Sequence, residues 1–117
     1  MRRVKVLIAD DNERIREYLV MLLGDKFEIV KAVPDGMSLV AAAIELHPDV
    51  IVSDISMPRL SGPRAMEELK TLLYDIPFVF VSADAPPTRN LGAAFVRKTD
   101  MGRALIPAVH QAFSGQL

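Results

Sequence analysis

The chain has 117 residues, the size of a single domain, no cysteine, and a formal net charge of −1 from 14 basic and 15 acidic residues. This composition excludes disulfides and thiolate metal sites, and the even charge balance gives no long-range attraction to nucleic acid or to anionic membranes. The apolar runs fall far short of the roughly 18 residues that a membrane span needs, and the start of the chain lacks the features of a signal peptide. We therefore expect one cytoplasmic domain over residues 1–117, without contact to nucleic acid or membrane.

Apolar runs of strand length alternate with segments of helical period. Residues 4–9 predict a first strand, and the helix after it ends at Gly24. The apolar face of that helix is formed by Ile15, Tyr18, Leu19, Leu22 and Leu23. Residues 27–33 predict a second strand, and the charges of Glu28 and Lys31 place it at an edge of the sheet, because edge strands are the ones that carry charge.

The middle of the chain continues this alternation. A helix begins at the turn of residues 35–36 and ends before Pro48, because the residue that precedes a proline avoids the helical conformation. Residues 50–52 form a short apolar run that is typical of a central strand buried on both faces. Ser61 then caps a third helix, which carries Pro63 in its first turn.

The inward face of the third helix consists of Ala65, Met66, Leu69, Leu72 and Leu73. After this helix, the last third of the chain adds two strands and a helix. Residues 78–81 and 94–97 predict the fourth and fifth strands, and Asp100 caps a last helix. One face of that helix carries Ile106, Val109 and Phe113.

Repeated alternation of strand and helix predicts an α/β fold, in which a parallel sheet is covered by helices on both faces. Five strands suit a doubly wound, flavodoxin-like sheet of strand order 2-1-3-4-5, although periodicity alone does not supply the order. In such sheets ligands bind beyond the carboxyl ends of the strands, where the strand order reverses. The residues that end the strands are therefore the candidates for chemistry.

Four of the five predicted strands end in a residue that can take part in chemistry. The first ends in Asp10 and Asp11, the third in Asp54, the fourth in Ser82 and the fifth in Lys98. Crowded carboxylates repel unless a cation lies between them, and oxygen ligands suit Mg²⁺. With a lysine, a hydroxyl and a nucleophilic carboxylate, such a site fits phosphoryl transfer. Taken singly, these residues read as a solvated helix start, a turn cap, a strand end and a surface charge; their conjunction carries the prediction.

Four stretches resemble the response regulator receiver family, the CheY-like superfamily of two-component signalling. They are residues 8–12 (IADDN), 54–62 (DISMPRLSG), 81–83 (VSA) and 95–98 (FVRK). The Asp-x-x-Met-Pro-x-x-x-Gly pattern of the second stretch is specific, and the resemblance covers nearly the whole chain. It implies the strand order 2-1-3-4-5 and a phosphorylated signalling module rather than an enzyme.

The resemblance also implies a phosphoryl acceptor and a metal cofactor. Asp54 would take a phosphoryl group from a sensor histidine kinase or a phosphotransfer protein. Mg²⁺ would be held by Asp11, Asp54 and the main-chain carbonyl of Ser56, with Asp10 assisting through water. The output would be a signalling response, such as transcription through a domain outside this chain.

Further residues match the family's phosphoryl contacts and its switch. Ser82 and Lys98 would contact the phosphoryl oxygens, together with the main-chain amide of Ala83. Phe95 matches the switch aromatic that turns inward as Ser82 moves toward the phosphate; its alternative role is plain packing on an edge strand.

Two features depart from the family pattern. Residue 99 is threonine where the family usually has proline in a cis peptide, and since a cis bond costs about 3 kcal/mol without proline, we expect a trans Lys98–Thr99 bond. The segment between Ser82 and Lys98 is several residues short, and Pro86 and Pro87 resist helix formation within it. We therefore expect the fourth helix to be shortened or replaced by a loop over residues 84–91.

Two alternatives remain open. The chain could be an interaction module that binds a partner regardless of phosphorylation, as the short segment and Thr99 suggest, or an aspartyl phosphatase, which usually needs a second acid where this chain has Ser56. In the family, the face formed by the fourth helix, the fifth strand and the last helix serves partners or homodimers. A shortened fourth helix therefore affects the output more than the phosphorylation, and homodimerisation is also left open.

Overall fold

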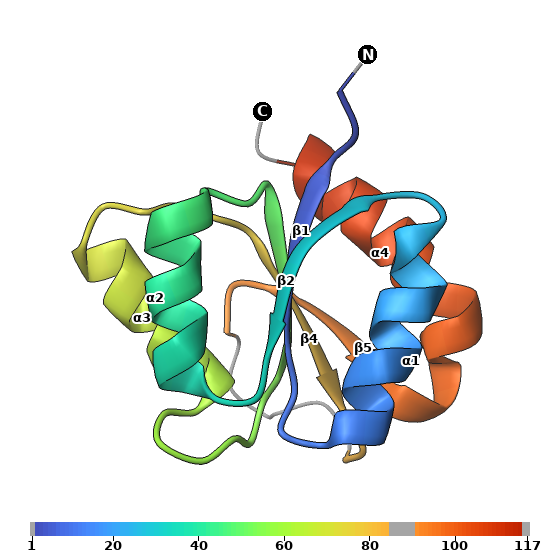
Figure 1. Cartoon of the computed structure of the whole chain (residues 1–117), viewed down its shortest axis with the longest axis horizontal. Helices are drawn as coiled ribbons and strands as arrows, with labels where there is room; N and C mark the ends of the chain where they lie inside the picture. The colour runs from blue at the N-terminus through green and yellow to red at the C-terminus, as the bar shows by residue number, and fades with distance from the viewer. Residues whose placement is uncertain (1, 85–90, 116–117) are drawn as a thin grey trace.

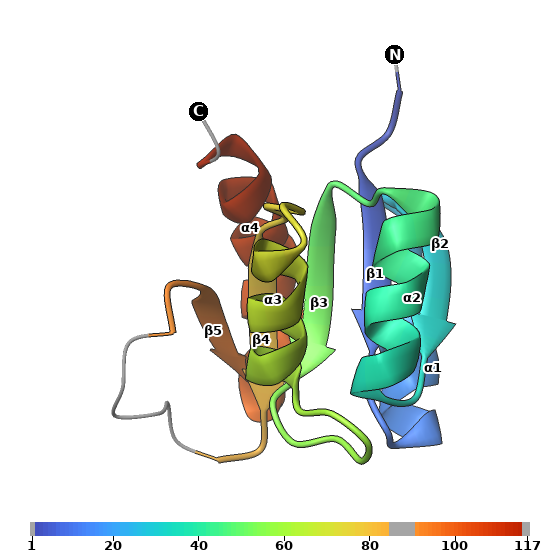
Figure 2. The same ribbon diagram turned by 90° about the vertical axis from the view of Figure 1, so that its left-hand side faces the viewer.

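The computed structural model describes residues 2–84 and 91–115, which form a five-stranded parallel sheet of order β2-β1-β3-β4-β5 (Figures 1 and 2). The strands are β1 (Lys5–Ala9), β2 (Glu28–Val33), β3 (Val50–Asp54), β4 (Phe78–Ser82) and β5 (Ala94–Arg97). The α-helices are α1 (Glu13–Gly24), α2 (Gly36–Leu46), α3 (Gly62–Thr71) and α4 (Met101–Ser114), and a 3₁₀ turn covers Lys98–Asp100. The predicted doubly wound α/β fold and its strand order are confirmed.

The helices form one layer on each side of the sheet, with α1 and α4 on one face and α2 and α3 on the other (Figures 1 and 2). All five residues of β3 are buried, as expected for a central strand, whereas Glu28 and Lys31 are exposed on the edge strand β2. No helix of the described residues is long and apolar enough to cross a membrane.

Three helices begin at capping residues beside the carboxyl edge of the sheet. The side chain of Asn12 accepts from the amide of Ile15 at the start of α1, and Ser61 accepts from Arg64 at the start of α3. At α2, Asp35 accepts from the amide of Ser38 at 2.8 Å. Each cap satisfies an amide that the first helical turn leaves without a partner, so the helix starts are fixed relative to the strand ends.

The prediction that the side chain of Asp100 caps the last helix is wrong. Asp100 occupies the position before α4, but its side chain makes no capping hydrogen bond. Its backbone (φ −108°, ψ 4°) belongs to the 3₁₀ turn rather than to the extended conformation that capping requires. The carboxylate instead accepts from Arg103 at 3.1 Å.

Four apolar residues that were predicted to face the core are exposed. Helix α3 ends at Thr71, so Leu72 and Leu73 lie beyond the helical period that would have turned them inward. Leu73 has a φ of 68° and an exposed fraction of 91%. Tyr18 and Phe113 each lie at the margin of a helix's apolar face, with exposed fractions of 36% and 37%.

The connection between β4 and β5 carries no helix in its described parts, residues 83–84 and 91–93. The predicted loop over residues 84–91 falls mainly on residues 85–90, which lie outside the described residues. After β5, the described residues contain no cis peptide bond, so Lys98–Thr99 is trans as expected.

Removing the α2 cap should destabilise the protein in a pH-dependent way. Hydrogen bonding from Ser38 holds the pKa of Asp35 below its ordinary value, despite the opposing effect of burial, and Arg59 adds a distant ion pair at 3.9 Å. A lowered folded-state pKa means that the stabilisation is present above the unfolded pKa and is lost as the pH falls through the folded value. We expect Asp35→Ala to lower the free energy of unfolding by about 1–2 kcal/mol at pH 7.

Urea unfolding at pH 7 and at pH 3 measures this effect, with the exposed Asp25→Ala as a control that should change little. The difference between wild type and Asp35→Ala should shrink at pH 3. An undiminished difference at pH 3 would contradict a role for the carboxylate charge.

Candidate functional site

The predicted site residues converge at the carboxyl edge of the sheet. Asp10 and Asp11 follow β1, Asp54 ends β3, Ser82 ends β4, and Lys98 follows β5. One carboxylate oxygen from each of the three aspartates lies within 4.8 Å of the others. The strands are parallel and β1 pairs with β3, so the acidic residues that end them become neighbours although more than 40 residues separate them in sequence.

Asp54 is held by its backbone more tightly than the sequence suggested. The strand continues two residues past the apolar run 50–52, so Asp54 is its last residue, as predicted, and is only 7% exposed. Its main-chain oxygen accepts from the hydroxyl of Ser53 at 2.7 Å and also faces the Cα of Gly62, where a Cβ would overlap it. The Gly62 amide donates to Ile55 at 2.9 Å. These contacts fix the direction in which the Asp54 carboxylate leaves the strand.

Asp10 is completely buried beside this carboxylate. Its amide donates to the Val33 carbonyl at 3.0 Å, and its Oδ1 accepts from the Asn12 amide at 2.9 Å. Its Oδ2 makes no hydrogen bond within the described part of the chain. Asp11, in contrast, is exposed, so the acidic cluster has a buried side and a side open to solvent.

Lys98 lies between two of the three carboxylates. Its Nζ is 3.1 Å from Asp10 Oδ2, an ion pair outside hydrogen-bond geometry, and 3.3 Å from Asp54 Oδ2, to which it donates. Burial opposes the lysine charge, but its interactions with Asp10 and then Asp54 outweigh burial and raise the pKa of Lys98. The ammonium is therefore charged at neutral pH and balances part of the acidic cluster.

One ammonium does not compensate three carboxylates. Burial, and then the negative charge of Asp10, raise the pKa of Asp54, and Lys98 only partly opposes this. A divalent cation at the open side would supply the missing charge. The available ligand atoms are all oxygens, and the buried Oδ2 of Asp10 accepts no hydrogen bond although it is ion-paired with Lys98, so the residues fit Mg²⁺ better than a soft metal.

The other predicted residues border this cluster. Ser56 is exposed in the loop after β3, and Ala83 is exposed directly after the buried Ser82. The Ser82 hydroxyl accepts from the Asp84 amide at 3.2 Å, which leaves its own proton available for donation. Phe95 lies on β5, which pairs with the strand that ends in Ser82. Its side chain is half-buried and packs on the α2–α3 side of the sheet, outside the acidic cluster.

Three further residues shape the site in ways that the sequence analysis did not assign, although Gly62 belongs to the pattern of residues 54–62. Arg16 donates from Nη1 to the main-chain oxygen of Asp10 at 2.9 Å. Gly36 leaves no room for a Cβ against the backbone of Leu60 and so holds the loop that carries Ser56; Gly62 does the same against Asp54. A lone arginine on a helix and a single glycine such as Gly36 are too common to single out, and the pattern that contains Gly62 does not say what this glycine contacts. Only the fold reveals their neighbours.

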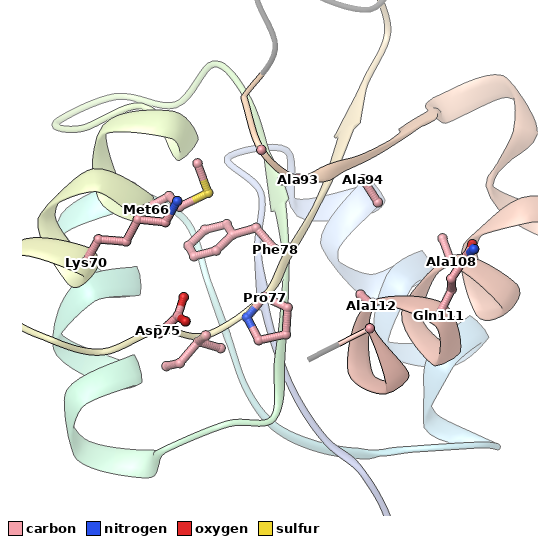
Figure 3. A pocket seen from close by; sticks show the side chains of 13 residues that line it. Met66, Lys70, Asp75, Pro77, Phe78, Ala93, Ala94, Ala108, Gln111 and Ala112 are labelled. Carbon is pink, nitrogen blue, oxygen red and sulfur yellow. The ribbon is translucent and has the colours of Figure 1, made fainter. Parts of the chain in front are cut away.

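A separate hollow of about 660 Å³ lies at the opposite end of the sheet (Figure 3). It is bounded by α3, by the amino ends of β4 and β5, and by the end of α4, with Met66, Lys70, Phe78 and Gln111 among its lining residues. None of the predicted site residues lines it, and its lining combines no nucleophile with an acid or base cluster. Among the described residues, the acidic edge is therefore the stronger candidate for a functional site than this hollow.

Comparison with known proteins gives a consistent family. The family model "Response regulator receiver domain" matches residues 6–99. Response regulator GacA of Pseudomonas aeruginosa is 31% identical over 97% of the chain, which spans 56% of that protein. A protein-glutamate methylesterase/protein-glutamine glutaminase of Syntrophomonas wolfei is 36% identical over 88% of the chain, which spans 32% of it.

Solved structures agree with this family. The response regulator domain of Thermotoga maritima CheB has a TM-score of 0.87 and 26% identity, covering 97% of this chain and 98% of that one. The chain spans about half or less of the full-length relatives, so the methylesterase activity in some of their names is not carried over to it. The chain belongs to the family of response regulator receiver domains.

Proposed function

We propose that this receiver domain is a Mg²⁺-dependent phosphoryl acceptor, with Asp54 as the residue that is phosphorylated. The observation that carries the proposal is the cluster of Asp10, Asp11 and Asp54 within 4.8 Å, with the Lys98 ammonium between two of them. Asp54 is the member of this cluster that ends the central strand.

The proposed transfer forms one bond and breaks one. A carboxylate oxygen of Asp54 attacks the phosphorus of a phosphohistidine, the phosphorus–nitrogen bond breaks, and the imidazole leaves with the electron pair. Lys98 already contacts Asp54 Oδ2 and stabilises the negative charge on the transferred group. The Ser82 hydroxyl and the Ala83 amide donate to the phosphoryl oxygens, and Phe95 follows Ser82 as the switch aromatic.

The residues present would hold Mg²⁺ through Asp11, Asp54 and the carbonyl of Ser56, with Asp10 assisting through water. When bound, the ion neutralises the carboxylates and the incoming phosphoryl oxygens. Asp10 is completely buried and already pairs with Lys98, which favours contact with the ion through water over direct ligation.

The phosphoryl donor and the output that we propose are those typical of the family. We propose that the phosphoryl donor is a sensor histidine kinase or a phosphotransfer protein, and that the transfer takes place in the cytoplasm. We also propose that residues 1–117 form one domain. A transcriptional output through another domain fits the names of relatives such as the transcriptional regulatory protein YdfI of Bacillus subtilis, 36% identical over 67% of the chain, which spans 37% of that protein. We also propose homodimerisation as a second way in which phosphorylation changes the output.

The second candidate is an interaction module that acts without phosphorylation. It is favoured by the short β4–β5 segment and by Thr99 after the lysine. The short segment concerns how a phosphorylated state would be passed on to a partner. Thr99 concerns the approach of Lys98 to the phosphoryl group, and Lys98 contacts Asp54 at 3.3 Å with threonine at this position. We therefore rank phosphoryl acceptance first.

Beryllofluoride, a phosphoryl mimic, separates the two candidates by NMR. With Mg²⁺ and beryllofluoride together, the amide signals of Asp54, Ala83 and neighbouring residues should shift, and removal of Mg²⁺ should reverse the shift. Mg²⁺ alone and beryllofluoride alone are the controls. Spectra that stay unchanged with both present would favour the interaction module.

A further inference from the structure

Arg16 is the one cation besides Lys98 that is bonded to a residue of the acidic cluster within the described part of the chain. It lies in the first turns of α1, half-buried, and its Nη1 reaches back to the main-chain oxygen of Asp10 at 2.9 Å. We propose that Arg16 is a positioning residue for the metal and phosphoryl site, which acts by orienting the Asp10–Asp11 peptide. The inference rests on the proposed function and names a residue that serves it.

The end of the β1–β2 ladder explains why Asp10 needs this partner. The amide of Asp10 donates to Val33, the last residue of β2. The amide and carbonyl of one residue point to the same side of a strand, so the Asp10 carbonyl faces a place where β2 has ended. The Asp35 amide, which would continue the parallel ladder, makes no bond to it in the described part of the chain. The Arg16 guanidinium supplies the missing donor to a residue that is completely buried.

The same hydrogen bond determines where Asp11 points. The oxygen that Arg16 holds belongs to the peptide that joins Asp10 to Asp11, so fixing it fixes the backbone rotation that directs the Asp11 side chain. Asp11 is exposed, and no side-chain hydrogen bond anchors its carboxylate within the described residues. Its place within 4.8 Å of Asp54 therefore depends on the backbone.

The fork of the arginine suits this task better than a lysine would. A guanidinium holds its donors in a rigid plane, whereas an ammonium is a mobile point charge on a flexible stem. Small displacements of a positioned group cost large factors in rate, so the loss of this hydrogen bond should act on the chemistry as well as on the fold.

The test compares Arg16→Met with Arg14→Met, which removes the same charge from an exposed position of the same helix that has no bond to Asp10. We expect Arg16→Met to slow phosphoryl uptake from acetyl phosphate about tenfold at saturating Mg²⁺, and to weaken Mg²⁺ binding about fivefold relative to Arg14→Met. Arg14→Met should stay within about twofold of wild type. The deficit should persist at high salt, because salt screens charge effects but not a lost orientation.

Circular dichroism measures the folded fraction of each variant, and each rate is corrected for it. Arg16→Lys, which retains the charge, should show a loss of rate and of Mg²⁺ affinity between those of wild type and Arg16→Met. It replaces Arg16→Met in the test if that variant does not fold. Equal rates and equal Mg²⁺ affinities for the Arg16 and Arg14 variants would overturn the inference while leaving the proposed function intact. If wild type itself takes up no phosphoryl group, the proposed function fails, and the Mg²⁺ affinities of the two variants still decide the role of Arg16.

Discussion

Asp54→Asn should abolish phosphoryl uptake and, without Mg²⁺, should make the protein more stable. The amide is a poor nucleophile, so the proposed transfer has no acceptor. It also removes one of three crowded carboxylates, and burial and the charge of Asp10 already raise the pKa of Asp54. A raised carboxylate pKa means that the ionised form is disfavoured in the folded state, so replacing it with a neutral group removes a cost present at neutral pH.

The expected gain is roughly 1 kcal/mol in the free energy of unfolding, because Lys98 loses one of its two partners and offsets part of the relief. Urea unfolding in EDTA and in excess Mg²⁺ measures it. Mg²⁺ should stabilise wild type by binding the folded state, and should stabilise Asp54→Asn less. The exposed Asp25→Asn is the control and should respond to Mg²⁺ as wild type does. A variant less stable than wild type in EDTA would contradict the charge argument.

Gly62→Ala should destabilise the protein by about 3 kcal/mol, because the packed backbone leaves no room for the added methyl group. A Cβ at Gly62 would overlap the main-chain oxygen of Asp54 and would lie 2.9 Å from both the Phe80 ring and the Ser53 hydroxyl. The nearest obstacle is the main-chain oxygen of Asp54, which cannot move aside without displacing Asp54 itself.

Gly24→Ala is the matched control, because Gly24 ends α1 and nothing lies within 4 Å of its Cβ position. Alanine favours a helix over glycine, so this variant should be neutral or more stable by up to about 1 kcal/mol. Urea unfolding of both variants gives the comparison. Gly62→Ala with the stability of wild type would show that the β3–α3 connection adapts, and that Asp54 is held less firmly than its contacts indicate.

The fold was predictable because its signals repeat along the chain. Strand-length apolar runs and helical periods recur, and the turn at residues 35–36 and the cap at Ser61 mark two helix starts, so each element was placed within about two residues. Most of the errors fall at helix ends, and the exposed Tyr18 lies at the margin of the apolar face of α1. Leu72 and Leu73 continue an apolar pattern that the backbone of α3 does not follow, and Asp100 has the residue type of a cap without its conformation.

The composition of the candidate site was predictable for a different reason. In a parallel sheet all strand ends share one edge, so the residue that follows each apolar run could be assigned to a common site from sequence. Contacts that depend on three-dimensional distance could not. The ion pair of Lys98 with Asp10, the hydrogen bond from Arg16, and the close approach of Gly36 to Leu60 join residues from separate elements, and no spacing along the chain encodes them.

The most direct test of the central claim is intact-mass analysis after incubation with acetyl phosphate. Wild type with Mg²⁺ should gain the mass of one phosphoryl group, and the adduct should be lost under the mild alkaline conditions that hydrolyse an acyl phosphate. The gain should be absent in EDTA and in Asp54→Asn. Wild type without an adduct, or Asp54→Asn with the same adduct, would contradict the assignment of Asp54 as the phosphoryl acceptor.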